Sequence, residues 1–301
     1  MSKQKFTAHS MPSMKDKTVL VTGGSGGLGA VTGRELARAG AHVVLAVRDT
    51  ARGEAAARTM PGSTEVRRLD VSDLDSVRAF AEEWNAPLDI LVNNAGVMAI
   101  PRRESAQGFE MQFATNHLGP FALTNLLLPH ITDRVVTVSS NAHRRPGAAF
   151  DFADPNSTVA YQPWRAYQAS KLANLLFTRA LERRLRAVES TVSAHAAHPG
   201  YSATGLQGKT GHAVQGLLLR VTNRLLAQPA EMGALPILYA ATQPLPGASY
   251  TGPAGRGELR GHPAPARMAP AALDDEAAER LWLLSDELTG AHFPFTGSGA
   301  T

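Results

Sequence analysis

Two residues that could move a proton lie four positions apart in the run YQASK, which begins at Tyr167 and ends at Lys171. The surrounding stretch from Trp164 to Ala187 has the apolar spacing of a long helix. Residues four apart share one face of a helix, so the phenol and the ammonium can converge. A nearby cation lowers the pKa of a tyrosine from about 10 and makes the phenol a usable general acid near neutral pH. An isolated pair of this kind would also fit an interfacial tyrosine beside a solvated lysine.

Other polar residues follow predicted strands and would lie at one edge of a parallel sheet. Ser140 ends one strand, the run from Asn93 to Gly96 ends another, and His198-Pro199-Gly200 follows a third. Ligands of open α/β folds bind at the carboxyl ends of the strands. The Ser140 hydroxyl could therefore bond a substrate carbonyl. Asn116, in the helix that follows Gly96, could hold a water chain to Lys171.

Strand and helix patterns alternate from Lys17 onward, and the strands are almost continuously apolar. This is typical of a parallel sheet covered by helices on both faces. We therefore predict the fold class as α/β: a single-domain Rossmann fold with a doubly wound, mostly parallel, seven-stranded sheet. The predicted strands span 18–22, 41–47, 65–71, 88–94, 134–140, 190–197 and 247–252, the last at an edge. The predicted helices span 28–39, 50–59, 72–84 with Ser72 as N-cap, 108–128, 164–187, 229–242 and 273–288.

The chain of 301 residues indicates one domain, spanning 17–301, after a disordered lead of residues 1–16 without the apolar core of a secretion signal. Segments 201–228 and 252–270 are predicted to form the substrate loop and lid. The absence of cysteine excludes disulfides, thiolate catalysis and cysteine-based zinc sites. The net charge of +4 comes with scattered arginines, so we expect no nucleic acid partner. No apolar run is long enough to span a bilayer, and we expect a cytoplasmic protein.

A glycine cluster follows the first strand in the sequence TVLVTGGSGGLGA, residues 18–30. In a doubly wound fold this turn receives the pyrophosphate of a dinucleotide, because backbone N–H groups and the helix N-terminus bind the anion and a Cβ would block its approach. The residues of this predicted site are Gly23, Ser25, Gly26, Gly27, Leu28 and Gly29. The same letters spell G-x-S-x-G, the turn that exposes a hydrolase nucleophile, here Ser25. Such a turn ordinarily follows several strands, whereas this one follows the first.

The end of the second strand predicts which dinucleotide binds. Arg48 stands where an acidic residue would accept a hydrogen bond from a free 2′-hydroxyl, and arginine instead matches a 2′-phosphate. With Arg52 one helical turn further on, Arg48 favours NADP(H) over NAD(H). Asp49 could take the acidic role if the strand ended one residue later. A solvated charge at a strand end is the plainer alternative for Arg48.

Together these motifs resemble the short-chain dehydrogenase/reductase family. TGGSGGLG, NNAG, Asn116, VVTVSS, YQASK and HPG occur in the family's order and at nearly its spacings, from Lys17 to Gly200. The sequence after HPG is similar to the subgroup that contains retinol dehydrogenases and protochlorophyllide reductase-like bacterial oxidoreductases. The resemblance implies a catalytic tetrad of Asn116, Ser140, Tyr167 and Lys171. It also implies cofactor contacts from the glycine turn and from Asp70, Val71, Asn94, Ala95, Gly96, Tyr167, Lys171, Pro199, Gly200 and Thr204, with Ser202 as an alternative to Thr204.

In the roles that this resemblance implies, Tyr167 is the acid or base and Lys171 binds the nicotinamide ribose. Ser140 orients the carbonyl, and Asn116 supports the proton relay. Family members commonly pair through their two long helices, which suggests a homodimer or tetramer, although the subgroup also contains monomers. The stretch between Ser140 and Tyr167 is longer than in the shortest members and should loop over the active site. Its candidates for substrate contact are His143, Arg144, Tyr161 and Trp164.

The sequence therefore predicts an NADP(H)-dependent oxidoreductase that interconverts a carbonyl and an alcohol on a small molecule, which could be lipophilic. Two alternatives stay open: a protein that senses NADP(H) without turnover, and a reductase of a conjugated C=C bond. The amphipathic segment 211–227 is predicted to be a lid, with contact to a membrane surface as the alternative. His195 and His198 would lie on opposite faces of a strand, and H-E-x-x-H is absent, so we predict no metal site.

Overall fold

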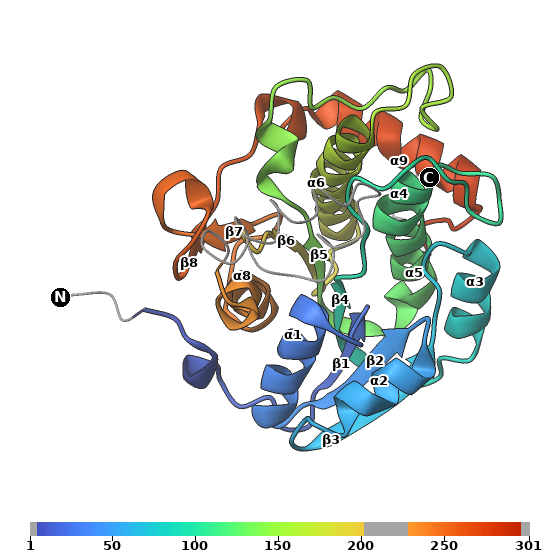
Figure 1. The fold of residues 1–301 in the computed structure, drawn as a ribbon. Helices are drawn as coiled ribbons and strands as arrows, with labels where there is room; N and C mark the ends of the chain where they lie inside the picture. Colours follow the sequence, from blue (N-terminus) through green and yellow to red (C-terminus); the bar gives the residue numbers. More distant parts are fainter. Residues whose placement is uncertain (1–4, 202–227, 296–301) are drawn as a thin grey trace.

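The strands form one central sheet in the computed structural model, which describes residues 5–201 and 228–295 (Figure 1). Its eight described strands are β1 (Thr18–Thr22), β2 (His42–Val47), β3 (Ser63–Arg68), β4 (Leu88–Asn93), β5 (Ile131–Val138), β6 (Ser193–Ala197), β7 (Tyr250–Pro253) and β8 (Pro263–Pro265). Their order is β3-β2-β1-β4-β5-β6-β7-β8, and every neighbouring pair is parallel except β7 with β8. This confirms a doubly wound Rossmann-like sheet. The order reverses between β1 and β4, where such folds bind ligands.

Helices cover both faces of this sheet. The described α-helices are α1 (Gly27–Arg38), α2 (Thr50–Ala57), α3 (Leu74–Glu82), α4 (Met111–Phe113), α5 (Gly119–Leu127), α6 (Pro163–Ala187), α8 (Ala230–Thr242) and α9 (Asp275–Thr289). One buried apolar cluster joins the sheet to α1, α2 and α8, and a second joins it to α3, α5 and α6. Strands β2 and β4 are buried along almost their whole length, which explains their continuous apolar sequences.

Most predicted strand bounds are shifted by one to three residues, and three further predictions are wrong, each for a local reason. The sheet has an eighth strand because Pro263–Pro265, inside the expected loop 252–270, pairs antiparallel with β7, so β7 is not an edge. Asp73 rather than Ser72 caps α3, because the Asp73 carboxylate accepts the N–H of Asp75 while Ser72 bonds Asp70. The expected helix 108–128 starts only at α4 and is interrupted by a π-helical turn over Ala114–Leu118.

The expected disorder of residues 1–16 is also wrong for the described part of that segment. Met14 is buried, and the Phe6 ring packs edge-on against Tyr239 of α8 at 5.0 Å. The Arg38 guanidinium of α1 donates to the Ala8 carbonyl at 2.6 Å. Residues 5–16 therefore lie along α1 and α8 and cover part of their outer surface.

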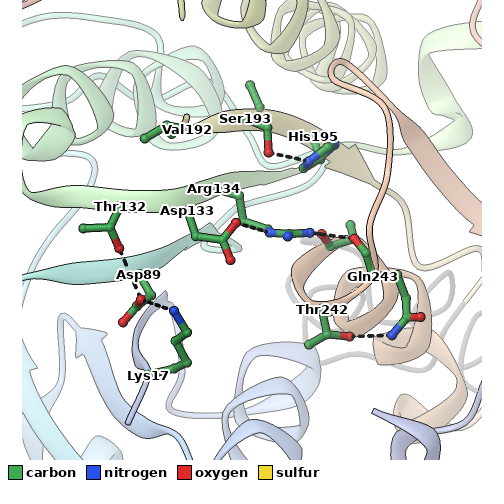
Figure 2. Close-up of polar contacts among 12 residues, drawn as sticks. Lys17, Asp89, Thr132, Asp133, Arg134, Val192, Ser193, His195, Thr242 and Gln243 are labelled. Atoms are coloured by element: carbon green, nitrogen blue, oxygen red, sulfur yellow. Dashed lines mark hydrogen bonds and ion pairs between the residues drawn. The ribbon is translucent and has the colours of Figure 1, made fainter. Parts of the chain in front are cut away.

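At the amino edge of the sheet, polar contacts hold neighbouring strands together (Figure 2). Lys17, next to β1, forms an ion pair with Asp89 of β4 at 2.7 Å, and Thr132 of β5 donates to the same carboxylate. Arg134 of β5 donates to the Gln243 carbonyl after α8 at 2.7 Å, which satisfies the end of that helix. These groups pair with one another, so this edge is structural.

Helix α9 covers the outer face of the long helix α6 within the same chain (Figure 1). Trp282 of α9 is buried against Phe121 of α5, with ring centroids 4.9 Å apart, and Arg184 of α6 stacks on its indole at 4.1 Å. Arg179 of α6 also pairs with Asp275 at 2.7 Å. Pairing of two chains through the long helices stays a prediction, and this part of α6 is not free for it.

The expected lid segment 211–227 and its alternative, contact with a membrane surface, lie outside the described residues. Among the helices of residues 5–201 and 228–295, none has the length and apolarity needed to cross a bilayer.

The close approach of α5 to the chain after β3 gives a prediction about stability. A Cβ on Gly119 would lie 1.8 Å from the Val71 carbonyl oxygen, so Gly119→Ala forces backbone apart. We expect a loss of about 3 kcal/mol in the free energy of unfolding. Gly26→Ala is the matched control, because Gly26 is extended and the nearest atom to its added Cβ is 3.9 Å away. Urea unfolding followed by circular dichroism measures both, and equal midpoints would contradict the predicted clash.

Candidate active site

A single cavity of about 910 Å³ runs along the carboxyl edge of the sheet, across the point where the strand order reverses. It brings together residues from distant parts of the sequence: the turn after β1, the ends of β2, β4 and β5, and the start of α6. The predicted site residues that line it are Gly23, Ser25, Gly26, Gly27, Leu28, Gly29, Arg48, Asp70, Val71, Asn94, Ala95, Gly96, Ser140, Tyr167, Lys171, Pro199 and Gly200. Thr204 and Ser202 lie outside the described residues.

The glycine turn at one side of the cavity has the shape that a pyrophosphate needs. Gly23 has a φ of +72°, and a Cβ on Gly29 would lie 2.5 Å from the Gly23 carbonyl oxygen. No side chain caps the start of α1, so its first N–H groups face the cavity with the partial positive charge of a helix N-terminus. Asn94 holds the turn in place by donating to the Thr22 carbonyl at 2.8 Å. The turn therefore fits a dinucleotide.

The alternative role of Ser25 as a hydrolase nucleophile finds no support in this geometry. A serine nucleophile needs a base within hydrogen-bond reach. Within the described residues, no hydrogen bond joins Ser25 to a histidine or a carboxylate, although Ser25 lines the cavity. The surrounding glycines allow the backbone to come close to a ligand, and they are not needed to expose a hydroxyl.

Charged side chains gather at the end of the cavity beside β2 and α2. Arg48 extends into solvent, with its guanidinium 3.8 Å from the Asp70 carboxylate. Asp49 acts as the N-cap of α2, since its carboxylate accepts the Arg52 N–H at 3.0 Å. The Arg52 guanidinium lies 3.9 Å from where a Cβ on Gly26 would be, so it flanks the phosphate turn. Two arginines thus border the place where the adenosine ribose of a bound dinucleotide would lie.

Ser140, Tyr167 and Lys171 meet in the interior part of the cavity. All three side chains line the cavity, Tyr167 and Lys171 are buried, and the Ser140 hydroxyl accepts the Ala142 N–H at 3.2 Å. The Lys171 Nζ lies 5.9 Å from the centre of the tyrosine ring and donates to the Val138 carbonyl at 2.9 Å. A buried phenol and a buried amine that share a cavity with a serine hydroxyl are suited to proton transfer.

The expected effect of Lys171 on Tyr167 is not the one that the structure gives. Burial raises the pKa of the Tyr167 phenol above its ordinary value of 10.0, and the Ser140 hydrogen bond lowers this pKa only in part. Burial also lowers the pKa of Lys171 to about 8, because the charged ammonium loses solvation. Desolvation rather than the neighbouring cation therefore sets the pKa of the phenol, and Tyr167 keeps its proton at neutral pH.

Asn116 lies in the π-helical turn and joins two walls of the cavity. Its amide oxygen accepts the Val97 N–H at 2.8 Å, and its nitrogen donates to the Val97 carbonyl and to the Ser170 hydroxyl, each at 2.9 Å. Both amide hydrogens are therefore engaged. The side chain fixes the loop after β4 against α6, and its predicted part in a water chain stays a prediction.

The structure separates the four candidates for substrate contact. Trp164 lines the cavity, but His143 bonds the Ser140 carbonyl and Arg144 forms an ion pair with Glu258. The Tyr161 hydroxyl donates to the Ile100 carbonyl at 2.8 Å, so it clamps the insertion to the loop after β4. Sequence reasoning missed three cavity residues beside the catalytic group, Met98, Arg145 and Gln168. Only position in a polar insertion or next to a motif could have pointed to them.

The two histidines considered for a metal have different partners, and only one of them lies within a strand. His195, in β6, bonds Ser193 near the amino edge (Figure 2), whereas His198 follows the strand and bonds Glu258 at 3.1 Å. In the described part of the chain, no group of three or more histidine or acidic side chains is arranged to hold a metal ion.

Comparison with known sequences identifies the family. The family model of short chain dehydrogenases matches residues 17–215. The chain belongs to the short-chain dehydrogenase family. This short-chain dehydrogenase is 40% identical to human retinol dehydrogenase 13 over 95% of its own length and 88% of the relative's. Human retinol dehydrogenase 14 is 38% identical, with 92% and 87% covered. A Streptomyces lividans protein named "Probable oxidoreductase" is 40% identical, with 88% and 95% covered. The predicted resemblance to the retinol dehydrogenase-like subgroup is confirmed.

Solved structures agree with the fold of this short-chain dehydrogenase. An uncharacterized protein from Mycobacterium paratuberculosis superposes with a TM-score of 0.85 at 50% identity, covering 97% of this chain and all of that one. A Beutenbergia cavernae protein proposed to be an NAD(P)-dependent gluconate 5-dehydrogenase has a TM-score of 0.58 at 26% identity, covering 76% and 91%. That structure holds NADP at low occupancy. A nicotinamide cofactor is thus a property of this family's cavity.

The buried Lys171 gives a prediction about pH. Its pKa is about 8 in the folded chain against 10.5 when unperturbed, so between these values the unfolded state binds more protons. The free energy of unfolding should therefore rise with pH from 8 toward 10, by up to about 3 kcal/mol. Below pH 8 the full cost of burying the charged ammonium is present. Lys171→Met should therefore have a larger free energy of unfolding than the wild type.

Urea unfolding of the cofactor-free protein between pH 7 and pH 10 tests this. The stability difference between Lys171→Met and the wild type should shrink as pH rises. The exposed Lys15→Met is the matched control and should show no such trend. A difference that stays constant over this range would mean that Lys171 does not carry the expected penalty.

Proposed function

We propose that this short-chain dehydrogenase is an NADP(H)-dependent oxidoreductase that interconverts a carbonyl compound and an alcohol. The observation that carries the proposal is that Ser140 and the buried side chains of Tyr167 and Lys171 line the same cavity as the glycine turn. The names of the relatives, retinol dehydrogenases 13 and 14, support alcohol and carbonyl chemistry. When bound, the nicotinamide supplies or accepts the hydride.

The protein's own part in this reaction is the movement of a proton. During reduction, the Ser140 hydroxyl would bond the carbonyl oxygen of the substrate and orient it toward Tyr167. The phenol, protonated at neutral pH because burial raises its pKa, then donates its proton to that oxygen as the carbon accepts the hydride. In the reverse direction the phenolate must accept the proton, which higher pH favours.

Lys171 would hold the nicotinamide ribose. Its Nζ lies 3.6 Å from the position of a Cβ on Gly96, so glycine leaves room for a sugar beside the amine. One hydrogen of the ammonium goes to the Val138 carbonyl, and two remain for ribose hydroxyls. Binding of a ribose would replace part of the solvation that burial removes from this amine.

The preference for NADP(H) rests on Arg48 and Arg52. Both border the adenosine end of the cavity, and arginine can bind a phosphate through two parallel hydrogen bonds. Asp49, which could have favoured NAD(H), is engaged as the cap of α2. The NADP found in the Beutenbergia cavernae relative adds support from within the family.

Two other functions use the same fold. A protein that only senses NADP(H) has no need of a serine, a buried phenol and a buried lysine in the cofactor cavity, so these residues argue against it. A reductase of conjugated C=C bonds would use the same hydride, and product analysis with an unsaturated ketone distinguishes it. Oxidation of NADPH by a panel of ketones and aldehydes, with the products identified, tests all three.

Removal of the phenol hydroxyl should stop the reaction without emptying the cofactor site. We expect Tyr167→Phe to lower kcat for carbonyl reduction by about a thousandfold. The dissociation constant for NADPH should change little, because the glycine turn and the arginines stay intact. Fluorescence titration of NADPH provides the control, and wild-type turnover in this variant would show that the acid is another group.

Reversal of the charge at Arg48 should change the choice of dinucleotide. We expect Arg48→Asp to lower the ratio of kcat/KM for NADPH over NADH by about tenfold or more, because a 2′-phosphate loses a charge-assisted partner and meets a carboxylate. Arg58→Asp is the matched control, since Arg58 is exposed at the end of α2 and does not line the cavity. If the ratio of kcat/KM for NADPH over NADH were unchanged in Arg48→Asp, Arg48 would not determine the choice of dinucleotide.

A further inference from the structure

The cations that line the cavity differ in whether the protein itself provides their counterions. Arg48 lies near Asp70, and Lys171 donates to a backbone carbonyl. Among the described residues, Arg52 and Arg145 line the cavity without an ion pair, one at each end. The Arg52 end is accounted for by the proposed 2′-phosphate. Arg145 comes from the insertion after β5, at the opposite side of the sheet order from Arg52, and Trp164 and Met98 line the same cavity.

Arg145 is exposed to solvent, and its guanidinium forms no ion pair in the described part of the chain. Its neighbour Arg144 takes the carboxylate of Glu258, at 2.9 Å. Arg165 adds a second positive charge, since its Nε lies 3.9 Å from where a Cβ on Gly147 would be, and no ion pair involves it in the described part of the chain. The backbone of Arg145 is fixed, because its N–H donates to Ala142 and its carbonyl accepts from Ala148, both at 3.0 Å. The backbone therefore keeps Arg145 at the rim of the cavity, where its guanidinium can reach an anionic ligand.

The other walls at this end are mainly apolar. Trp164, Met98 and Pro146 line the space between Tyr167 and Arg145, and the Trp164 ring stands edge-on to the Tyr167 ring at 6.0 Å. An aliphatic chain could lie against these side chains. A ligand group that reached Arg145 would meet one cation. None of the described residues that line this end of the cavity carries a carboxylate.

We propose that the substrate is a carbonyl compound with a carboxylate at some distance from the reacting carbon, and that Arg145 binds this carboxylate. The inference rests on the proposed function, because it names the substrate class of the same site. The carbonyl would reach Ser140 and Tyr167 while the apolar chain lies along Trp164. Neutral carbonyl compounds would still react, with a lower kcat/KM.

A homologous series of ω-oxo carboxylates and their methyl esters tests the proposal, because each pair differs in one charge. With NADPH, the wild type should reduce the best acid with a kcat/KM about tenfold above that of its ester. Arg145→Gln should remove this preference by lowering kcat/KM for the acid to about that for its ester. Arg165→Gln is the matched control, since it removes a nearby charge that does not line the cavity. Equal use of acid and ester by the wild type, or a preference that survives Arg145→Gln, would overturn the proposal.

A binding experiment separates this inference from the proposed function. Calorimetry with the NADPH complex should give about tenfold tighter binding for an unreactive fatty carboxylate than for its primary amide, and Arg145→Gln should equalise the two. This binding result does not require that any carbonyl compound be reduced. A failure to reduce carbonyl compounds would contradict only the proposed function. If esters were reduced but neither experiment showed a preference for the carboxylate, only the proposed carboxylate site would be contradicted.

A second inference comes from the buried ring of His143. Its Nε2 accepts the N–H of Ala269 at 3.2 Å, so the ring proton must be on Nδ1, which donates to the Ser140 carbonyl at 2.6 Å. The backbone N–H of His143 reaches the same carbonyl only at 3.4 Å. Burial lowers the pKa of His143 to about 4, so the neutral ring keeps this arrangement at neutral pH.

We infer that His143 is a positioning residue that holds Ser140 in place in the cavity that Tyr167 also lines. The ring ties the residue after β5 to the segment that follows β8, and its edge packs on Tyr250 at 5.6 Å between ring centroids. Without the ring, the Ser140 carbonyl keeps only its long backbone bond. The segment that carries the Ser140 hydroxyl would then lose a contact that fixes its position in the cavity.

Asparagine can separate the hydrogen bond from the bulk of the ring, because its amide nitrogen occupies nearly the place of Nδ1. We expect His143→Leu to lower kcat about tenfold with little change in KM, and His143→Asn to stay within about threefold of the wild type. Absorbance titration should also show the Tyr167 phenol ionising at higher pH in His143→Leu, relative to a Tyr167→Phe background. An unchanged kcat in His143→Leu, or an equal loss in both variants, would overturn this role.

Discussion

The burial of a phenol and an amine side by side at the start of α6 is the constraint on which the proposed chemistry depends. Water would stabilise the phenolate and the ammonium, and its exclusion favours the neutral form of each group. Burial accordingly raises the pKa of Tyr167 and lowers that of Lys171 to about 8. A site prepared in this way holds a proton for donation, while the amine gains most from a ligand with hydroxyl groups.

Such a site needs rigid walls, because a buried polar group that loses its partner costs free energy. Asn116 joins the loop after β4 to α6, and Val138 accepts from Lys171 at the end of β5. On the outside, α9 covers α6 with Trp282 and with ion pairs to its arginines. The long helix is therefore fixed on both sides, and the position of Tyr167 follows from packing remote from the cavity.

The cavity has arginines at two places and both polar and apolar lining residues between them. Arg48 and Arg52 border one end, and Arg145 borders the other. At the phosphate turn, glycine lets the backbone come close to a ligand, whereas a side chain there would block the approach. The same parallel sheet provides all these positions, because parallel strands end at one edge and the strand order reverses between β1 and β4.

Local sequence patterns predicted most of the elements and the candidate residues that the fold brings to one cavity. Apolar runs placed β1 and α6 within a residue of their observed bounds, and the run from Tyr167 to Lys171 fixed a shared helical face through local geometry alone. Local patterns could not reveal β8, since its three residues pair only with a strand brought near by folding. The interruption around Asn116 likewise depends on tertiary contacts of that turn.

The tertiary structure alone decided the direction of the pKa changes and the roles within the insertion. Burial depends on residues distant in sequence, so spacing suggested a lowered pKa for Tyr167 where desolvation raises it. Neighbouring residues His143, Arg144 and Arg145 look alike as polar loop residues, yet one holds Ser140, one pairs with Glu258 and one lines the cavity. Long-range packing sets which partner each side chain contacts. The order of charges along the sequence does not contain this information.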